Sequence, residues 1–161
     1  MTDLPMIAVI DIDGVLADVR HRLHHVTREP KDWPAFFAAA DKDPLLEQGA
    51  DTVRQLGEVY PVVYLSGRPE RLRRTTLAWL ACHELPEGDL VLRPQDDHRP
   101  ARLFKVEALD RLAAASTVVV LVDDDPKVLD AARTAGYDVL PATWMDERTE
   151  LHEVQERDGR T

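Results

Sequence analysis

The chain has 161 residues and a formal net charge of −10, with 44% hydrophobic and 31% charged residues. This length suits one domain, and no apolar run approaches the ~20 residues that a membrane-spanning helix needs. The N-terminus lacks the features of a signal peptide, and Cys82 as the only cysteine excludes an intrachain disulfide. We therefore expect a cytoplasmic protein without a membrane partner, in which Cys82 is a packed helix residue.

Apolar runs and turn residues predict strands that alternate with helices. The strands are expected over residues 6–11, 61–65, 90–92, 117–122 and 137–140. The helices are expected over residues 48–58, 70–82, 102–114 and 126–135, the last with Gly136 as its C-cap. Such alternation is typical of parallel βαβ units, and it predicts an α/β fold with a central parallel sheet and helices on both faces.

Residues 18–45 contain three prolines and are expected to form an irregular, partly helical insert after the first strand. We expect one domain over residues 1–145 and a polar tail over 146–161 that is a solvated helix or disordered. An insert this short predicts a rather open cleft, and open clefts suit polymer ends or large phosphorylated partners better than small metabolites. The aromatic residues of the insert, Trp33, Phe36 and Phe37, are expected to pack it onto the core rather than to stack bases.

Two carboxylates, Asp11 and Asp13, follow the first apolar run directly. They lie at the C-terminal end of a predicted strand, which is the edge where open α/β sheets bind ligands. Asp11 can act as a nucleophile, because a carboxylate is ionised at neutral pH and can form an acyl-phosphate. Asp13 is placed to protonate a leaving oxygen and then to deprotonate water. The competing interpretation is an ordinary strand end with an Asp-Gly turn.

A second group of carboxylates, Asp123, Asp124 and Asp125, follows the apolar run at 117–122. Carboxylate oxygens suit Mg²⁺, so the two strand ends predict one cation site. Strand residues alternate sides, so the three cannot all face it. We expect two of them to serve the cation, one directly and one through water or Lys105. Asp125, just before a proline, is expected to cap the next helix.

Phosphate ligands are expected from two further places. Ser66 and Gly67 offer a hydroxyl and free amides at a strand end, and Arg68 adds a guanidinium suited to phosphate. Lys105 follows an arginine-rich loop, where it can offset the charges of Asp11 and a bound phosphate together. Taken alone, Ser-Gly is a common turn and an isolated lysine is most often a solvated surface residue.

The order of these motifs along the chain resembles the haloacid dehalogenase superfamily, over about residues 6–145. The resemblance implies a Rossmann-like three-layer α/β/α core and an Mg²⁺-dependent phosphohydrolase with Asp11 as nucleophile and Asp13 as acid/base. Ser66 and Lys105 would be phosphate ligands. The metal would take Asp11, the carbonyl of Asp13 and one carboxylate of the Asp123/Asp124 pair, with Asp124 favoured as the direct ligand.

Several segments look like the phosphatase domain of phage-type polynucleotide kinase/phosphatase, which removes 3′-phosphates from nucleic acid ends. They are residues 11–17, Arg22, residues 66–68, residues 92–94, Arg99, Lys105 and residues 122–124. The resemblance implies substrate contacts by Gly67, Arg22, Arg68, Arg93 and Arg99, and a role in nucleic acid repair. The chain departs from the family at Ala101-Arg102, where an Asp is common, and this bears on substrate identity more than on catalysis.

The net charge disfavours broad binding of nucleic acid, but basic side chains gather in three groups. The groups lie within residues 20–28, 68–74 and 93–105. The histidines of the first group, His21, His24 and His25, lack the spacing and partners of a zinc site. We expect them to belong to a phosphate-facing or solvated basic patch.

The function predicted from these features is a phosphomonoesterase for a 3′-phosphate on a nucleic acid end or a nucleotide. A phosphatase for a small metabolite or free nucleotide is one alternative, and a non-catalytic module that binds a phosphorylated ligand is another. The chain has no Gly-rich loop ending in Gly-Lys-Ser/Thr, so a kinase or ligase activity would come from a separate partner. The natural substrate and the oligomeric state are left open.

Overall fold

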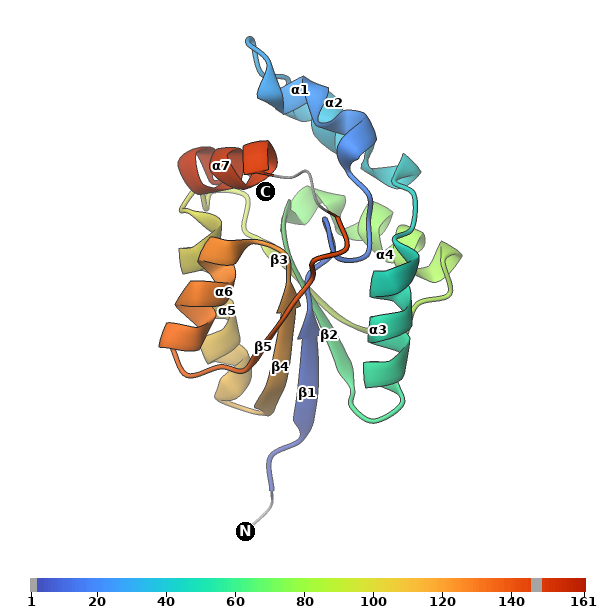
Figure 1. Cartoon of the computed structure of the whole chain (residues 1–161), viewed down its shortest axis with the longest axis vertical. Helices are drawn as coiled ribbons and strands as arrows, with labels where there is room; N and C mark the ends of the chain where they lie inside the picture. The colour runs from blue at the N-terminus through green and yellow to red at the C-terminus, as the bar shows by residue number, and fades with distance from the viewer. Residues whose placement is uncertain (1–2, 146–148) are drawn as a thin grey trace.

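The structure is a computed structural model that describes residues 3–145 and 149–161. Figure 1 shows a central sheet with helices on both sides. Its strands pair in parallel in the order β3-β2-β1-β4-β5, which confirms the predicted three-layer α/β/α fold. The strands are β1 (Met6–Ile10), β2 (Val62–Pro69), β3 (Gly88–Arg93), β4 (Thr117–Asp123) and β5 (Val139–Pro141).

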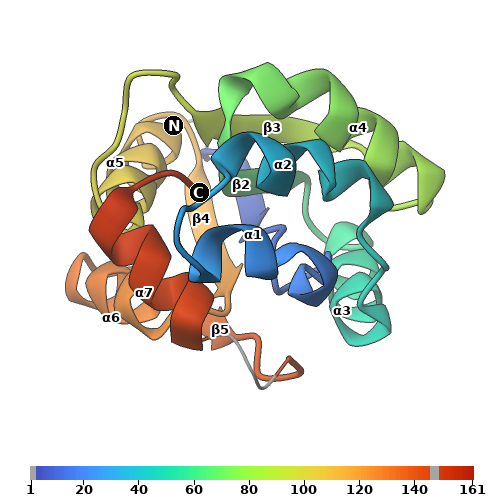
Figure 2. The ribbon, with the colours of Figure 1, turned by 90° about the horizontal axis from the view of Figure 1, so that it is seen from above.

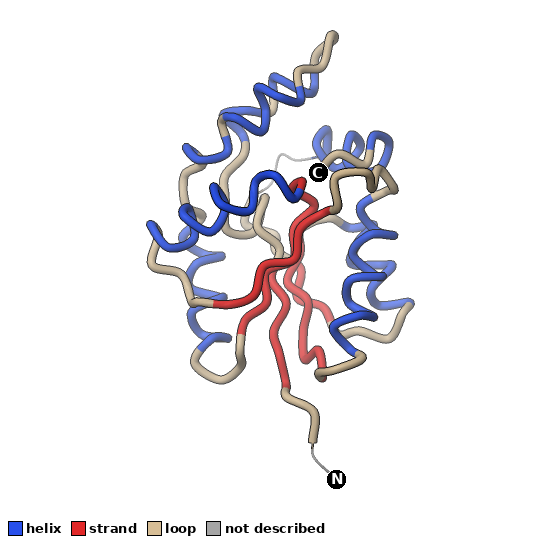
Figure 3. The backbone as a smooth tube through the Cα atoms, turned by 180° about the vertical axis from the view of Figure 1, so that it is seen from behind, coloured by secondary structure: helices blue, strands red, loops and turns tan. Residues whose placement is uncertain are grey.

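The strands read as continuous apolar runs because both faces of the sheet are covered. Ala8 and Ile10 pack toward α3 and α4, whereas Ile7 and Val9 pack toward α5 and α6. Figure 3 shows the strands lying between these two helical layers. The helices are α3 (Glu47–Gly57), α4 (Arg73–Cys82), α5 (Ala101–Ala113) and α6 (Pro126–Thr134), with the 3₁₀ turn η3 (Glu70–Leu72) before α4.

Element boundaries differ from the prediction in a few places. β2 continues through the Ser66–Arg68 motif to Pro69, although the motif was expected to end the strand. The helix expected over 70–82 begins with the separate turn η3. Gly136 lies one residue beyond the C-cap of α6, where its φ is +95° and its N–H donates a hydrogen bond to the carbonyl of Arg133. Cys82 ends α4 but is exposed, so its predicted packing was wrong.

One irregularity interrupts the pairing of β1 with β4. Ile7 pairs with Val118, but Ala8 pairs with Val120, so β4 carries one extra residue there. Above this bulge the pairing is regular again up to Ile10.

The insert forms short helical pieces above the C-terminal edge of the sheet. They are η1 (Arg20–Arg22), α1 (His24–Thr27), α2 (Trp33–Ala38) and η2 (Ala40–Lys42). Phe36 and Phe37 are buried in a cluster with Val26 and Leu72, which confirms that the aromatic residues pack the insert onto the core. Trp33 packs at the edge of the same cluster.

The C-terminal segment corrects the prediction of a solvated or disordered tail. Helix α7 (Thr149–Asp158) lies beside α1 above the sheet edge (Figure 2). Leu151 is fully buried in the cluster of the insert, and Val154 is buried as well. The first tail residues, 146–148, lie outside the described part of the chain. Among the described residues, no helix has the length and apolar character needed to cross a bilayer.

Candidate active site

The carboxylates of two neighbouring strands meet at the C-terminal edge of the sheet. Because Ile10 pairs with Val122, Asp11 and Asp123 emerge side by side. Asp124 completes a group in which one ligand atom from each residue lies within 4.8 Å of the others. Three carboxylates at this spacing fit a hard divalent cation such as Mg²⁺. We call these three residues, together with Lys105, the acidic pole.

Lys105 is buried among these carboxylates. Its Nζ lies 2.6 Å from Asp123 Oδ2 and 3.1 Å from Asp11 Oδ1. Burial alone would lower the pKa of Lys105, but Asp11 and Asp123 raise it well above its ordinary value, so the ammonium stays charged. This places a fixed positive charge beside the predicted nucleophile, and the lysine is not the solvated surface residue of the competing interpretation.

Asp11 is short of positive charge even with Lys105 beside it. Burial, followed by the charges of Asp123 and Asp124, raises the pKa of Asp11 well above its ordinary value, and Lys105 opposes this only in part. A carboxyl group whose pKa is raised in this way is stabilised in its ionised form by any additional cation beside it. The electrostatics of the pole therefore fit the same divalent ion as its geometry.

The consecutive aspartates after β4 have different partners. Asp123 accepts hydrogen bonds on both oxygens, from Lys105 and from the N–H of Asp125 at 2.9 Å. Asp124 Oδ2 lies 2.9 Å from Nε2 of His152, a residue of α7. Asp125 accepts the N–H of Lys127 as the N-cap of α6, which confirms its predicted capping role.

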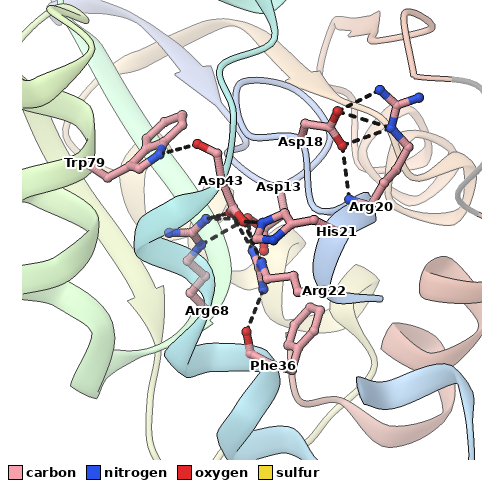
Figure 4. Close-up of polar contacts among 9 residues, drawn as sticks. All are labelled: Asp13, Asp18, Arg20, His21, Arg22, Phe36, Asp43, Arg68 and Trp79. Atoms are coloured by element: carbon pink, nitrogen blue, oxygen red, sulfur yellow. Dashed lines mark hydrogen bonds and ion pairs between the residues drawn. The ribbon is translucent and has the colours of Figure 1, made fainter. Parts of the chain in front are cut away.

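Asp13 is held by two arginines (Figure 4). Its Oδ1 accepts Arg68 Nη2 at 2.7 Å, Arg68 Nε at 3.0 Å and Arg22 Nη2 at 3.2 Å. Both guanidinium groups are fully buried, and Arg22 also stacks over the ring of Phe36. The structure thus pairs the two predicted substrate-binding arginines with the predicted acid/base, while their contact with substrate stays a prediction.

A second carboxylate, Asp43, balances the two arginines. It accepts Arg22 Nε at 2.7 Å and Nη2 at 2.8 Å, and Arg68 Nη2 at 3.0 Å. Asp13, Asp43, Arg22 and Arg68 form a buried neutral quartet, drawn in Figure 4. Sequence reasoning missed Asp43, because it lies in the irregular insert, and only the Asp-Pro pair there hints at a fixed turn.

His21 also contacts the neutral quartet, with its Nε2 2.6 Å from Asp43 Oδ1. Part of the predicted basic patch, His21 and Arg22, therefore binds Asp43 inside the protein. Within residues 3–145 and 149–161, the group of three close metal-ligating side chains is the one in the acidic pole, and no histidine belongs to it.

Ser66 and Gly67 lie in the last part of β2. Ser66 is buried, and its Oγ accepts the N–H of Arg68 at 3.2 Å. Gly67 has no room for a side chain, since a Cβ there would lie 2.2 Å from the carbonyl carbon of Thr161. The C-terminal segment therefore reaches Gly67, one of the predicted phosphate-binding residues Ser66 and Gly67.

The last two predicted substrate residues, Arg93 and Arg99, differ in their surroundings. Arg93 is buried, and it donates to the carbonyls of Gly67 at 3.3 Å and Arg99 at 2.8 Å. Burial lowers the pKa of Arg93 to about 10. The side chain of Arg99 is 45% exposed, and its guanidinium pairs with Asp97 and Glu107. The structure brings Arg93 to Gly67 but turns Arg99 toward the surface.

The centre of the site is covered rather than open. Asp11 and Lys105 are each 4% exposed, Asp13 is 3% exposed and Ser66 is 1% exposed. The expectation of an open cleft was wrong for this structure, because it was based on the short insert alone. Helix α7 adds a second cover beside α1.

Comparison with protein families and solved structures agrees with this geometry. The family described as "Polynucleotide kinase PNKP phosphatase domain" matches residues 5–144. A search of curated proteins found no match. The matched range contains the acidic pole and the neutral quartet and ends before α7.

Two solved chains share the fold at moderate sequence identity. One, from the "Structure of Pnkp1/Rnl/Hen1 complex", is 27% identical with a TM-score of 0.72 over 88% of this chain and 47% of that chain. The other, from the "Structure of the Pnkp1/Rnl/Hen1 RNA repair complex", is 26% identical with a TM-score of 0.70 over 86% of this chain and 42% of that chain. The chain thus spans less than half the length of these relatives.

A third solved structure, a putative haloacid dehalogenase-like hydrolase from Burkholderia xenovorans, is 15% identical with a TM-score of 0.61. The match covers 97% of this chain and 97% of that chain, and at this identity it shows a shared fold alone. The family match covers well over half of the sequence. The chain therefore belongs to the family of polynucleotide kinase phosphatase domains within the haloacid dehalogenase superfamily, and it is a phosphatase.

Proposed function

We propose that this phosphatase removes 3′-phosphates from nucleic acid ends or nucleotides, with Mg²⁺ and an aspartyl-phosphate on Asp11. The observation that carries the proposal is the buried juxtaposition of Asp11 with Lys105 and two further carboxylates, with Asp13 two residues away in the neutral quartet. A module that only binds a phosphorylated ligand has no need for a nucleophile and an acid/base together.

In the proposed reaction, a carboxylate oxygen of Asp11 forms a bond to phosphorus while the bond to the leaving oxygen breaks. Asp13 gives a proton to the leaving oxygen. Water then attacks the phosphorus of the aspartyl-phosphate, Asp13 takes its proton, and phosphate leaves with Asp11 restored. The neutral quartet fixes the orientation of the Asp13 carboxyl group through both steps.

Asp11, Asp124 and the main-chain carbonyl of Asp13 would hold the Mg²⁺, with Asp123 kept in place by Lys105. The ion would supply positive charge that lets an anionic phosphate approach an anionic nucleophile. Lys105 contributes to the same end from the protein side, because its ammonium lies 3.1 Å from Asp11. Ser66 and the amide of Gly67 would hold the remaining phosphate oxygens.

Nucleic acid ends are the favoured substrate because of the family match and the basic residues near the site. The chain matches a polynucleotide kinase phosphatase domain, and a relative 26% identical comes from an RNA repair complex. Arg22, Arg68, Arg93 and Arg99 are the residues proposed to serve the substrate. Because both solved relatives come from multi-component complexes, we also propose a separate kinase or ligase as partner.

The test is phosphate release with Mg²⁺ from a 3′-phosphorylated oligonucleotide, compared with 3′- and 5′-mononucleotides. We expect kcat/KM for the oligonucleotide to be higher by about tenfold or more, a difference of about 1.4 kcal/mol in barrier. Asp11→Asn should lower turnover by about 10⁴-fold or more, since the nucleophile is lost. Retained turnover would contradict the covalent mechanism, and full activity in a chelator would contradict the cation.

A second candidate function is a phosphatase for free nucleotides or small metabolites. The observation that favours it is the cover formed by the insert and α7, because small ligands are held best in enclosed sites. Higher kcat/KM for a mononucleotide than for the oligonucleotide would support this candidate.

A further inference from the structure

Helix α7 contacts the acidic pole through the side chain of His152. His152 Nε2 lies 2.9 Å from Asp124 Oδ2. An ionised carboxylate only accepts hydrogen bonds, so the ring nitrogen is the donor. His152 lies beyond residues 5–144, the range that matches the family. The contact is therefore made by a residue outside that range.

The position of His152 is well defined, because α7 is anchored on several sides. Leu151 and Val154 are buried, Glu156 pairs with Arg102 of α5 at 2.8 Å, and Asp158 pairs with Lys31 of the insert at 2.5 Å. Figure 2 shows α7 beside α1 above the strands. The imidazole side chain, 18% exposed, thus reaches Asp124 from an anchored helix.

We propose that His152 is a positioning residue that orients Asp124 for the cation, so that cation binding and docking of α7 are coupled. A hydrogen bond on Oδ2 fixes the rotation of the carboxylate and directs Oδ1 for metal ligation, which is the usual task of the partners behind metal ligands. If α7 docking strengthens cation binding, the cation must strengthen α7 docking by the same factor. The inference rests on the cation site proposed above.

The coupling has a consequence for the other side of the site. Beyond α7 the chain continues to Thr161, whose backbone packs against Gly67 and whose carbonyl is 3.5 Å from Arg93 Nη2. One segment therefore contacts both the acidic pole and Gly67 of the predicted phosphate-binding residues. A cation that favours docking of α7 also favours this cover over Gly67.

The first test compares Mg²⁺ affinity by isothermal titration calorimetry for the full chain and three variants. His152→Ala should weaken binding about 10- to 100-fold, the usual cost of losing such a partner. His152→Gln should stay close to the unsubstituted chain, because its amide can donate the same hydrogen bond. Glu153→Ala is the matched control, since it changes an exposed residue of the same helix without removing an anchor of α7 and should leave the affinity unchanged.

Turnover and hydrogen exchange separate positioning from a merely structural role. Turnover of His152→Ala should recover at saturating Mg²⁺, because the defect is in binding the ion. Amide exchange in α7 should slow on adding Mg²⁺ to the full chain but not to His152→Ala. If that variant fails to fold, the exchange experiment on the unsubstituted chain decides, and an unchanged α7 overturns the proposal.

Equal Mg²⁺ affinities of His152→Ala and the unsubstituted chain would overturn the positioning role and leave the proposed function intact. A failure of the unsubstituted chain to bind Mg²⁺ would overturn both.

Discussion

The acidic pole and the neutral quartet lie at the same sheet edge, and their first members are two residues apart, yet their charge balance differs. The acidic pole sets three carboxylates against one ammonium group. The neutral quartet sets two carboxylates against two guanidinium groups. A buried group with excess charge needs a ligand, whereas a balanced one is complete within the protein. The comparison assigns cation binding to the pole and orientation of Asp13 to the quartet.

The largest loss of stability should come from removing one charge of the neutral quartet. Asp43→Asn leaves two buried arginines against one carboxylate, and breaking a buried pair in this way costs about 3–5 kcal/mol. We expect a lower free energy of unfolding in urea and slower turnover, because Asp13 loses its fixed partners. Asp41→Asn, an exposed change in the same insert, is the control, and equal effects of the two variants would contradict the role of Asp43.

A smaller effect of opposite sign is expected from the acidic pole. In the metal-free protein, Asp11→Asn should raise the melting temperature by about 2–4 °C, or about 1 kcal/mol, because it removes a carboxylate that is costly to ionise. Differential scanning fluorimetry in a chelator measures this shift. Mg²⁺ should then stabilise the unsubstituted chain more than the variant, and an equal gain would contradict the place of Asp11 in the cation site.

The same variant has a pH dependence whose sign follows from the raised pKa of Asp11. Its folded-state pKa lies above the ordinary value of 3.8, so its contribution to stability is present below that value and is lost as pH rises through the folded-state pKa. The advantage of Asp11→Asn in chelator should therefore grow from acid toward neutral pH. A constant difference across this range would contradict the raised pKa.

The smallest effect is expected outside both groups, at Arg99. Its side chain is nearly half exposed, and exposed ion pairs contribute less than about 1 kcal/mol, so Arg99→Ala should hardly change stability. Release of phosphate from a minimal aryl phosphate should also be unchanged, and any loss should be confined to the KM for oligonucleotides. A loss on the aryl phosphate would place Arg99 closer to the reacting group than the structure does.

The carboxylates of the acidic pole could be predicted from the sequence because each one directly follows a recognisable apolar run. Apolar runs in a parallel sheet mark buried strands, and carboxylates directly after them must gather at one edge. Asp11 and Asp123 were found in this way, and so was the capping role of Asp125. The buried state of Lys105 depended on the resemblance, since nothing local distinguishes it from a surface lysine.

Asp43 and His152 could not be found by the same reasoning. Each comes from a segment without strand or long-helix periodicity, and each reaches the site only through packing between distant parts of the chain. The tail was mistaken for a solvated segment because its buried stripe is narrow. Leu151 and Val154 are three residues apart in an otherwise polar sequence, and they are enough to bury one side of α7 against the insert.

The bulge between β1 and β4 bears on how this fold tolerates change in chain length. A strand that slips by one residue turns every side chain to the opposite face, which would exchange Asp123 and Asp124 across the sheet. Because of the extra residue in β4, the register of its pairing with β1 at Ile7 already differs by one residue from the register at Ile10. The lower part of the sheet can therefore gain or lose a residue at the bulge while the carboxylates at the upper edge keep their alignment.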